Sequence, residues 1–318
     1  MTTYIELFGG LIYLLWGGDL LVRGSVALAR RARLSPAVVA ATVVALGTSL
    51  PELVVSVQAV LTGYPGIALG NVVGSNIANV LLVVGAAAAI CPHARTDLPP
   101  RRDTVLMLVV SALFVALCLT TGLHRLTGAV LLTGLILIWG IVLREAAHAQ
   151  RSAEARGRLE WVLGLPSQTW MILLFIGAGV IGLPIGADLV VDAAVDIAAQ
   201  LGVSDTVIGL TILAISTSLP ELATTLVAAC QKRTGVALGT IVGSNVLNIL
   251  LIMGAASLLS PTPIPIPYTF RVLDFPILLG SALLVGVYVA RKRPIGRVAG
   301  LVMIVTYTAY VAALYSGR

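Results

Sequence analysis

The sequence predicts an all-α integral membrane protein with ten transmembrane helices, built as two inverted five-helix repeats. Three observations support this fold class. Of the 318 residues, 58% are hydrophobic and 11% are charged, with a mean hydropathy of +1.02, whereas soluble domains carry about 25% charged residues. Apolar stretches long enough to cross a bilayer recur along the whole chain, and its two halves are similar in sequence.

The expected spans are apolar stretches of about 18 residues or more, the length that a helix needs to cross the hydrocarbon core. Between the fifth and sixth stretches the chain is hydrophilic for too short a distance to form a soluble domain, which indicates a linker. The ten stretches lie near residues 4–29, 36–61, 67–90, 104–122, 126–143, 168–200, 206–229, 235–258, 272–290 and 296–315.

The basic residues predict the orientation of the chain. With ten spans and an external N-terminus, 16 of the 20 Lys and Arg residues fall in cytoplasmic turns, as the positive-inside rule requires. We therefore expect a multi-pass protein of the cell (inner) membrane with both termini outside. A nucleic-acid-binding function is excluded because no folded basic face remains. The 16 residues are Arg30, Arg31, Arg33, Arg95, Arg101, Arg102, Arg144, Arg151, Arg156, Arg158, Lys232, Arg233, Arg291, Lys292, Arg293 and Arg297.

An internal duplication relates the two halves. Residues 17–85 align without a gap to residues 186–254, with 29 identities in 69 positions. Because each half has five spans, an odd number, the second half must enter the membrane from the opposite side. Inverted repeats are typical of secondary transporters. The predicted units are a first five-helix repeat (1–150, motif 42–85), a short cytoplasmic linker (151–167) and a second five-helix repeat (168–318, motif 211–254).

Two carboxylates lie inside apolar spans at equivalent positions, Glu52 and Glu221. A bare charge there is costly, so each should face a cavity or a cation. Arg23 is the only base within the core spans, and it lies near a membrane surface, where it can snorkel. The missing partner of the two carboxylates is therefore predicted to be a transported ion.

Neutral oxygens accompany each glutamate. Pro51 and Pro220 remove a backbone N–H, so the spans should kink and the carbonyls of Gly47 and Ser216 should lose their usual donors. Hydroxyl and amide side chains recur three or four residues apart, on one face of a helix. They are Thr48, Ser49, Ser75 and Asn79 in the first half and Thr217, Ser218, Ser244 and Asn248 in the second.

This donor set predicts a hard cation. Ca²⁺ takes six to eight oxygen ligands in flexible geometry, and no nitrogen or sulfur ligand accompanies the oxygens, which argues against zinc or copper. Na⁺ is similar in size and also prefers oxygen, so one cavity could hold both ions in turn.

Two pairs of segments carry a specific resemblance. GTSLPE (47–52) with GNVVGSNIAN (70–79), and STSLPE (216–221) with GTIVGSNVLN (239–248), resemble the alpha-repeats of the sodium/calcium exchanger family, within the cation/Ca²⁺ exchanger superfamily. The chain has no large cytoplasmic insert between its halves, which is typical of prokaryotic members. The resemblance covers nearly the whole chain.

The resemblance implies a secondary active antiporter that exchanges Ca²⁺ for Na⁺ by alternating access, with no enzymatic activity and no cofactor. Its partners are these ions and the lipid bilayer, and a monomer suffices. The ion site is expected between the second, third, seventh and eighth helices. The implied ligands are Thr48, Ser49, Glu52, Ser75, Asn79, Thr217, Ser218, Glu221 and Ser244, with the backbone carbonyls of Ala45 and Ala214.

Two departures from the family pattern leave alternatives open. Ser216 stands where the pattern has glycine, and Asn248 stands where several members carry an aspartate, which leaves two core carboxylates. Exchange of Ca²⁺ or another divalent cation for H⁺ is therefore the alternative function.

Other readings have less support. Gly17-Gly18-Asp19 suggests an intramembrane aspartyl protease, a distant alternative because that chemistry needs two different aspartate motifs and here one motif is duplicated. A channel would more often be an oligomeric ring. Asp19 and Asp188 are expected to be structural or gating positions. The three cysteines, Cys91, Cys118 and Cys230, are expected to be small core residues.

Overall fold

The computed structural model describes residues 2–32, 34–92, 101–153, 165–201 and 216–316. Within these ranges every regular element is a helix, and the only β-contact is a single bridge between Leu123 and Ile264. The prediction of an all-α protein is confirmed.

The helices follow the expected apolar stretches, several of them divided by short π-helical segments. The first half contains α1 (Thr2–Arg31), α2 (Pro36–Val39), η1 (Ala40–Val44), α3 (Ala45–Thr48), α4 (Leu50–Leu61), α5 (Pro65–Ala78), η2 (Asn79–Val84), α6 (Gly85–Ile90), α7 (Arg101–Thr120) and α8 (Arg125–Ala153). The second half contains α9 (Thr169–Gln200), α12 (Leu219–Cys230), α13 (Thr234–Leu247), η4 (Asn248–Met253), α14 (Gly254–Leu259), η5 (Phe270–Asp274), α15 (Phe275–Ala290) and α16 (Arg297–Ser316).

The described residues provide up to nine membrane crossings. Eight helices are long and apolar enough by themselves, and a ninth crossing results if Pro36–Thr48 and Leu50–Leu61 form one span bent by 46°. The stretch expected at 206–229 lies partly outside the described residues, and its described part contains α12, which has 12 residues. The total of ten spans and the inversion of the repeats stay predictions.

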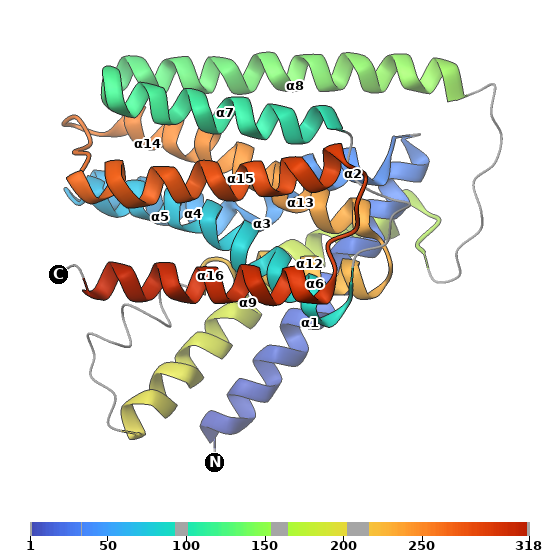
Figure 1. Cartoon of the computed structure of the whole chain (residues 1–318). Helices are drawn as coiled ribbons and strands as arrows, with labels where there is room; N and C mark the ends of the chain where they lie inside the picture. Colours follow the sequence, from blue (N-terminus) through green and yellow to red (C-terminus); the bar gives the residue numbers. More distant parts are fainter. Residues whose placement is uncertain (1, 33, 93–100, 154–164, 202–215, 317–318) are drawn as a thin grey trace.

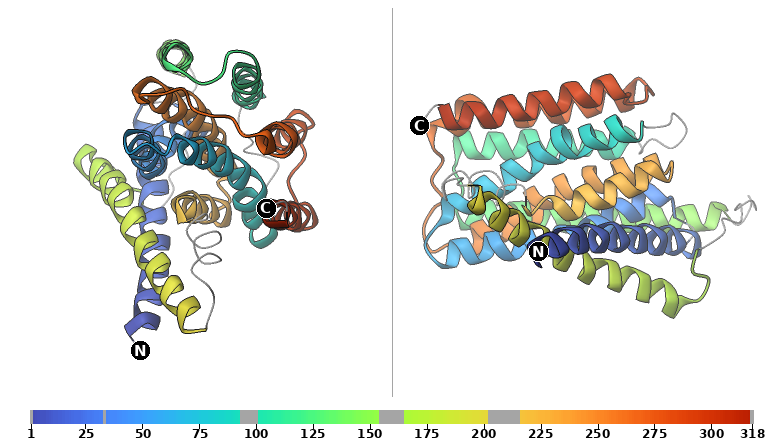
Figure 2. Two further views of the ribbon diagram at one scale, coloured as in Figure 1. Left: turned by 90° about the vertical axis from the view of Figure 1, so that its left-hand side faces the viewer. Right: turned by 90° about the horizontal axis from the view of Figure 1, so that it is seen from below.

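Two long helices, α1 and α9, lie side by side and are inclined to the rest of the bundle (Figures 1 and 2). Glycines let their backbones touch. A Cβ atom added at Gly179 would lie 2.6 Å from the Cβ atom of Leu21 and 2.8 Å from the carbonyl oxygen of Gly17. Close backbone approach through small residues is a common way of packing helices in membranes. The pair thus has a smooth, tightly fitted contact.

The centre of the bundle consists of one span from each half. In the most apolar 18-residue stretch of Thr234–Leu259, 94% is buried inside the protein, and in that of Pro65–Ile90 the buried share is 72%. The other spans that qualify by themselves are 22–44% buried. The two central spans carry the repeated GSN segments, so these polar residues lie at the middle of the protein.

The prediction that all three cysteines are core residues is wrong for two of them. Cys91, directly after α6, and Cys230, the last residue of α12, form a disulfide with their Cα atoms 5.1 Å apart. The pairing escaped prediction because 139 residues separate the two cysteines and packing alone brings them together. Cys118 is buried in α7, as expected.

A lysine takes a glycine conformation in the turn between α12 and α13. Lys232 has φ +58°, and the equivalent residue of the first half is Gly63, with φ +88°. A left-handed backbone costs about 1–2 kcal/mol for a residue with a side chain. We expect Lys232→Gly to stabilise the protein by about 1 kcal/mol and to raise the midpoint of thermal unfolding in detergent. Lys232→Ala removes the charge but keeps the strain, so it should not. An unchanged midpoint in Lys232→Gly would show that the turn is unstrained.

Candidate cation site

Each half breaks its glutamate-bearing span at the serine of the TSLPE segment. Ser49 has φ −86° and ψ 2°, and Ser218 has φ −90° and ψ 0°. The proline two residues later lies in the first turn of the next helix, α4 or α12, where the missing N–H costs no helical hydrogen bond. Each glutamate follows this proline in the first turn, where the partial positive charge of a helix N-terminus favours a carboxylate. The predicted kink is confirmed in the first half, where the span bends by 46°; in the second half most of the segment before α12 lies outside the described residues, so that kink stays a prediction.

The two glutamates are fully buried and close to one another. Glu52 is 1% exposed and Glu221 is 0% exposed, and the two carboxyl groups interact electrostatically. The Oγ atom of Ser49 donates to Oε1 of Glu221 at 3.4 Å, so the motifs of the two halves meet. Thr48 and Ser244 also lie beside the Glu221 carboxyl group.

No basic side chain neutralises these carboxylates. Among the side chains that the structure describes, neither glutamate has Lys or Arg within ion-pairing distance, and Arg23 pairs instead with Asp19 at 2.7 Å. Two buried carboxylates without a basic partner are expensive unless a cation joins them.

Four asparagines connect the halves reciprocally. Nδ2 of Asn76 donates to the carbonyl of Asn245 at 3.1 Å, and Nδ2 of Asn245 donates to the carbonyl of Asn76 at 3.3 Å. Nδ2 of Asn79 donates to Oδ1 of Asn245 at 3.1 Å, and Nδ2 of Asn248 donates to Oδ1 of Asn76 at 3.0 Å. These bonds fix the orientation of both amides, and within the described residues the Oδ1 atoms of Asn79 and Asn248 have no partner.

Several buried oxygens around the glutamates lack a partner. Nine buried side-chain oxygens have no hydrogen bond in the described part of the chain, and five of them belong to predicted ligands. Such atoms are uncommon in proteins and need an explanation such as a missing ion. The five are Oε2 of Glu52, Oε2 of Glu221, Oδ1 of Asn79, Oδ1 of Asn248 and Oγ of Ser244.

The backbone at the asparagines is also unusual. The π-helical segments η2 and η4 begin at Asn79 and Asn248, the last residues of the two repeated motifs. π-helical turns inside α-helices are frequent at functional sites because they widen the helix locally. The repeats thus share this feature as well as their side chains.

The other predicted ligands are less fully placed. Ser75 and Ser218 are buried, and Thr217 is half-buried in the turn before α12. The carbonyl of Ala45 already accepts the N–H of Ser49 at 3.0 Å and the hydroxyl of Thr48 at 3.2 Å. Ala214 lies outside the described residues.

Sequence reasoning missed the residues that orient the ligands. Asn76 and Asn245 fix the amides of Asn79 and Asn248, and Asn71 donates to the carbonyl of Glu52 at 3.2 Å and to Oγ of Ser56 at 2.9 Å. The repeated GSN segment was a signal for the first two. Asn71 had no such signal, because the second half has Thr240 at the equivalent position.

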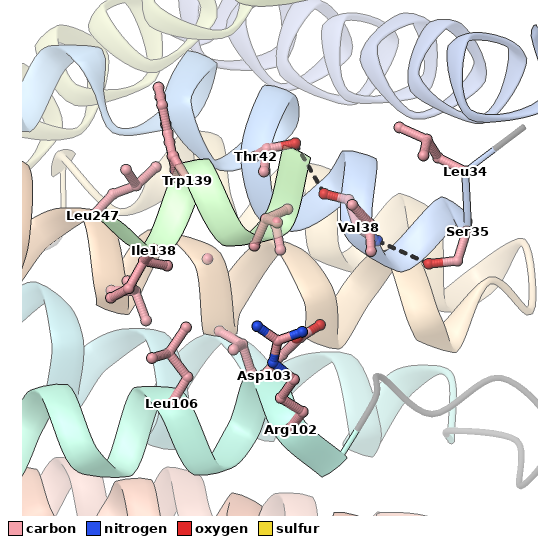
Figure 3. Close-up of a pocket in the computed structure, with 15 residues that line it drawn as sticks. Leu34, Ser35, Val38, Thr42, Arg102, Asp103, Leu106, Ile138, Trp139 and Leu247 are labelled. Carbon is pink, nitrogen blue, oxygen red and sulfur yellow. Dashed lines mark hydrogen bonds between the residues drawn. The ribbon is translucent and has the colours of Figure 1, made fainter. Parts of the chain in front are cut away.

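A separate cavity of about 250 Å³ lies between α2, η1, α7, α8 and α13 (Figure 3). Its walls are mainly apolar, with Val38, Ile138 and Trp139 facing it, and Arg102 and Asp103 lie at one end. Neither Glu52 nor Glu221 lines it, so it is not the candidate cation site.

Known proteins resemble this chain over almost its whole length. The family model described as "Sodium/calcium exchanger protein" matches residues 3–144 and 171–316. The putative antiporter CaxA of Alkalimonas amylolytica is 34% identical, covering 96% of this chain and 97% of the relative. The sodium/calcium exchanger MaX1 of Methanosarcina acetivorans is 33% identical, covering 98% of each.

Solved structures agree with the sequence comparison. The sodium-calcium exchanger NCX_Mj, soaked with zero Na⁺ and Ca²⁺, superposes with a TM-score of 0.81 at 32% identity, covering 98% of each chain. The similarity in sequence and in three-dimensional arrangement thus covers nearly the whole chain, and the chain belongs to the sodium/calcium exchanger family.

Proposed function

We propose that this cation/Ca²⁺ antiporter exchanges Ca²⁺ for Na⁺ by alternating access, through one site centred on Glu52 and Glu221. The observation that carries the proposal is the set of unpaired buried oxygens around two carboxylates that have no basic partner. A bound cation satisfies all of these groups at once.

The donor set suits a hard cation that moves through the site as substrate. Carboxylate, amide, hydroxyl and carbonyl oxygens are the ligands that Ca²⁺ prefers. The proposed ligands are the side chains of Thr48, Ser49, Glu52, Ser75, Asn79, Thr217, Ser218, Glu221, Ser244 and Asn248, with a carbonyl near Ala45 and Ala214.

The symmetry of the contacts supports inverted repeats of five spans. Equivalent residues bond reciprocally across the centre, and the serine breaks share one backbone conformation. In such transporters one bundle moves against the other. The pair of α1 and α9 is the bundle that would move, because it is inclined to the spans that carry the ligands and packs on them through glycines: a Cβ atom added at Gly18 of α1 would lie 3.3 Å from the backbone of Ala223 in α12.

Exchange of a divalent cation for H⁺ is the second candidate. Asn248 favours it, because an amide in place of a carboxylate leaves two acidic groups, which two protons can neutralise. A protease is not favoured, because Asp19 is occupied by Arg23 at 2.7 Å and by Gln231 at 2.6 Å.

Uptake of ⁴⁵Ca²⁺ into proteoliposomes separates the two exchangers. We expect uptake when Na⁺ is loaded inside and diluted outside, and no uptake when a pH gradient is imposed without Na⁺. The reverse pattern would establish H⁺ coupling. If neither the Na⁺ gradient nor the pH gradient drives ⁴⁵Ca²⁺ uptake, the exchange function is contradicted.

The proposed orientation predicts the labelling of single cysteines. In a Cys91→Ser/Cys230→Ser background, which leaves only the buried Cys118, Ser152→Cys should react with a membrane-impermeant maleimide only from the cytoplasm. Ser316→Cys should react only from outside. In Figure 1 the ends of α8 and α16 lie at opposite ends of the bundle, which supports this expectation. Labelling of both from one side would contradict the proposed topology.

A further inference from the structure

The disulfide joins the two ligand-bearing parts of the bundle at one end. Cys91 ends the central span that begins with α5 and carries Asn79, and Cys230 ends the helix that begins beside Glu221. Any water-filled path from the site to this end needs neighbouring helices to separate. A disulfide cannot span Cα atoms more than about 7 Å apart, and these are 5.1 Å apart. The bond therefore keeps the ends of α6 and α12 from separating.

Basic residues surround this end of the bundle. Lys232 and Arg233 lie two and three residues after Cys230, and α1 ends with Arg30 and Arg31. Burial, and then the positive charges of Arg30 and Arg23, lower the pKa of the Arg233 guanidinium, and the Asp19 carboxylate opposes this shift. By the positive-inside rule this is the cytoplasmic end.

A disulfide is unexpected in that compartment. Glutathione and thioredoxin keep cytosolic thiols reduced, and cytosolic disulfides are usually transient or redox-sensing. The position of the pair allows such exchange, because the Cys230 residue is exposed and Cys91 is half-buried. The surrounding positive charge also attracts glutathione disulfide, which is an anion.

The turn after Cys230 is also hydrogen-bonded to α1. Nε2 of Gln231 donates to Oδ1 of Asp19 at 2.6 Å, and Oδ2 of Asp19 accepts from Nε of Arg23 at 2.7 Å. Asp19 lies on α1, one of the two helices of the inclined pair. The residue next to the disulfide is thus linked to the element whose motion would open the site.

We propose that Cys91 and Cys230 form a reversible thiol–disulfide site that closes the cytoplasmic path when oxidised. The inference rests on the exchange function and the orientation proposed above. The oxidant is a small disulfide such as glutathione disulfide. The thiolate of one cysteine attacks it and releases one glutathione, and the second cysteine then displaces the other. Two electrons pass to glutathione disulfide, and the two protein thiol protons end on two glutathione thiols.

Trapping of thiols in cells tests the redox site without any transport assay. Cells are quenched in acid, alkylated with N-ethylmaleimide, reduced, and labelled with a maleimide of high mass for a gel shift. We expect no shift in unstressed cells and a shift of two labels after treatment with diamide, a thiol oxidant. A bond already present in unstressed cells, or no bond after diamide, would overturn the proposal.

Flux measurements test the gate. Purified protein is equilibrated in glutathione buffers, reconstituted, and assayed for Na⁺-driven ⁴⁵Ca²⁺ uptake. We expect the oxidised protein to be about tenfold slower or more, because conformational opening sets the rate of many such cycles, and we expect dithiothreitol to restore the flux. Cys91→Ser and Cys230→Ser should keep the reduced rate in every buffer. Equal flux in the oxidised and reduced protein would overturn the gate.

The two readouts separate the failure of this inference from the failure of the proposed function. If no variant transports Ca²⁺ in any buffer, the exchange function is wrong and the gate falls with it, while trapping still decides whether the thiol pair cycles. If impermeant maleimide reaches Cys230 of the reduced protein only from outside, the orientation is wrong and the pair is not a cytoplasmic site.

Discussion

Replacing either buried glutamate by glutamine should abolish Ca²⁺ exchange while leaving folded protein in the membrane. Glu52→Gln and Glu221→Gln each remove half of the negative charge that faces a divalent ion. A charged hydrogen-bonding or ionic partner in a buried site is worth about 3 kcal/mol or more, so we expect Ca²⁺ affinity to fall at least ~100-fold. Binding titration and ⁴⁵Ca²⁺ flux measure the loss.

The matched control is Glu6→Gln, the same change on an exposed residue of α1. It should leave both affinity and flux unchanged. The glutamine variants should elute from size-exclusion chromatography like the wild type, because glutamine has nearly the same shape. Wild-type flux in either variant would show that the site lies elsewhere.

Changing Asn248 to aspartate should alter the electrical character of the exchange. With Glu52 and Glu221 as the only carboxylates, a site that holds Ca²⁺ is neutral, and so is one that holds two Na⁺. We therefore expect the wild type to exchange without moving net charge. Asn248→Asp adds a third negative charge at the position whose amide oxygen has no partner. Three Na⁺ would neutralise the three carboxylates, so each exchange of three Na⁺ for one Ca²⁺ would move one net charge.

The measurement is Na⁺-driven Ca²⁺ flux with the potential clamped by valinomycin and K⁺. One net charge across 100 mV changes the driving free energy by about 2.3 kcal/mol, which is roughly 40-fold in the equilibrium ion ratio. Asn248→Asp should show this dependence and the wild type should not. Gln58→Glu, an amide-to-acid change on the exposed face of α4, is the control. A strong potential dependence in the wild type would contradict neutral exchange.

The glutamates and the fold class could be predicted from the sequence because both depend on local patterns. A carboxylate in an apolar span and a proline before it are visible in the sequence without knowledge of partners. The duplication then identified Asn79 and Asn248 as equivalent. These inferences needed only the hydropathy of the spans and a helical period of three to four residues.

The contacts between distant segments could not be predicted in this way. Alignment of the repeats places Asn76 on Asn245, but it does not show that the two bond to one another. The link from Gln231 to Asp19 spans 212 residues, and the disulfide has no counterpart in the other repeat. Such pairs depend on how helices pack, which the sequence of one chain does not encode locally.

The reciprocal asparagine bonds have a consequence for the ancestry of the site. Because the amide of Asn79 is oriented by the second half and that of Asn248 by the first, neither half completes its own ligands. The same bonds would form between two identical half-length chains, since each half supplies the same donor and acceptor. With the proposed inversion, two such half-length chains inserted in opposite orientations would together present the same set of ligands. In the single chain the two halves are free to differ, and they do so at Asn71 and its equivalent Thr240.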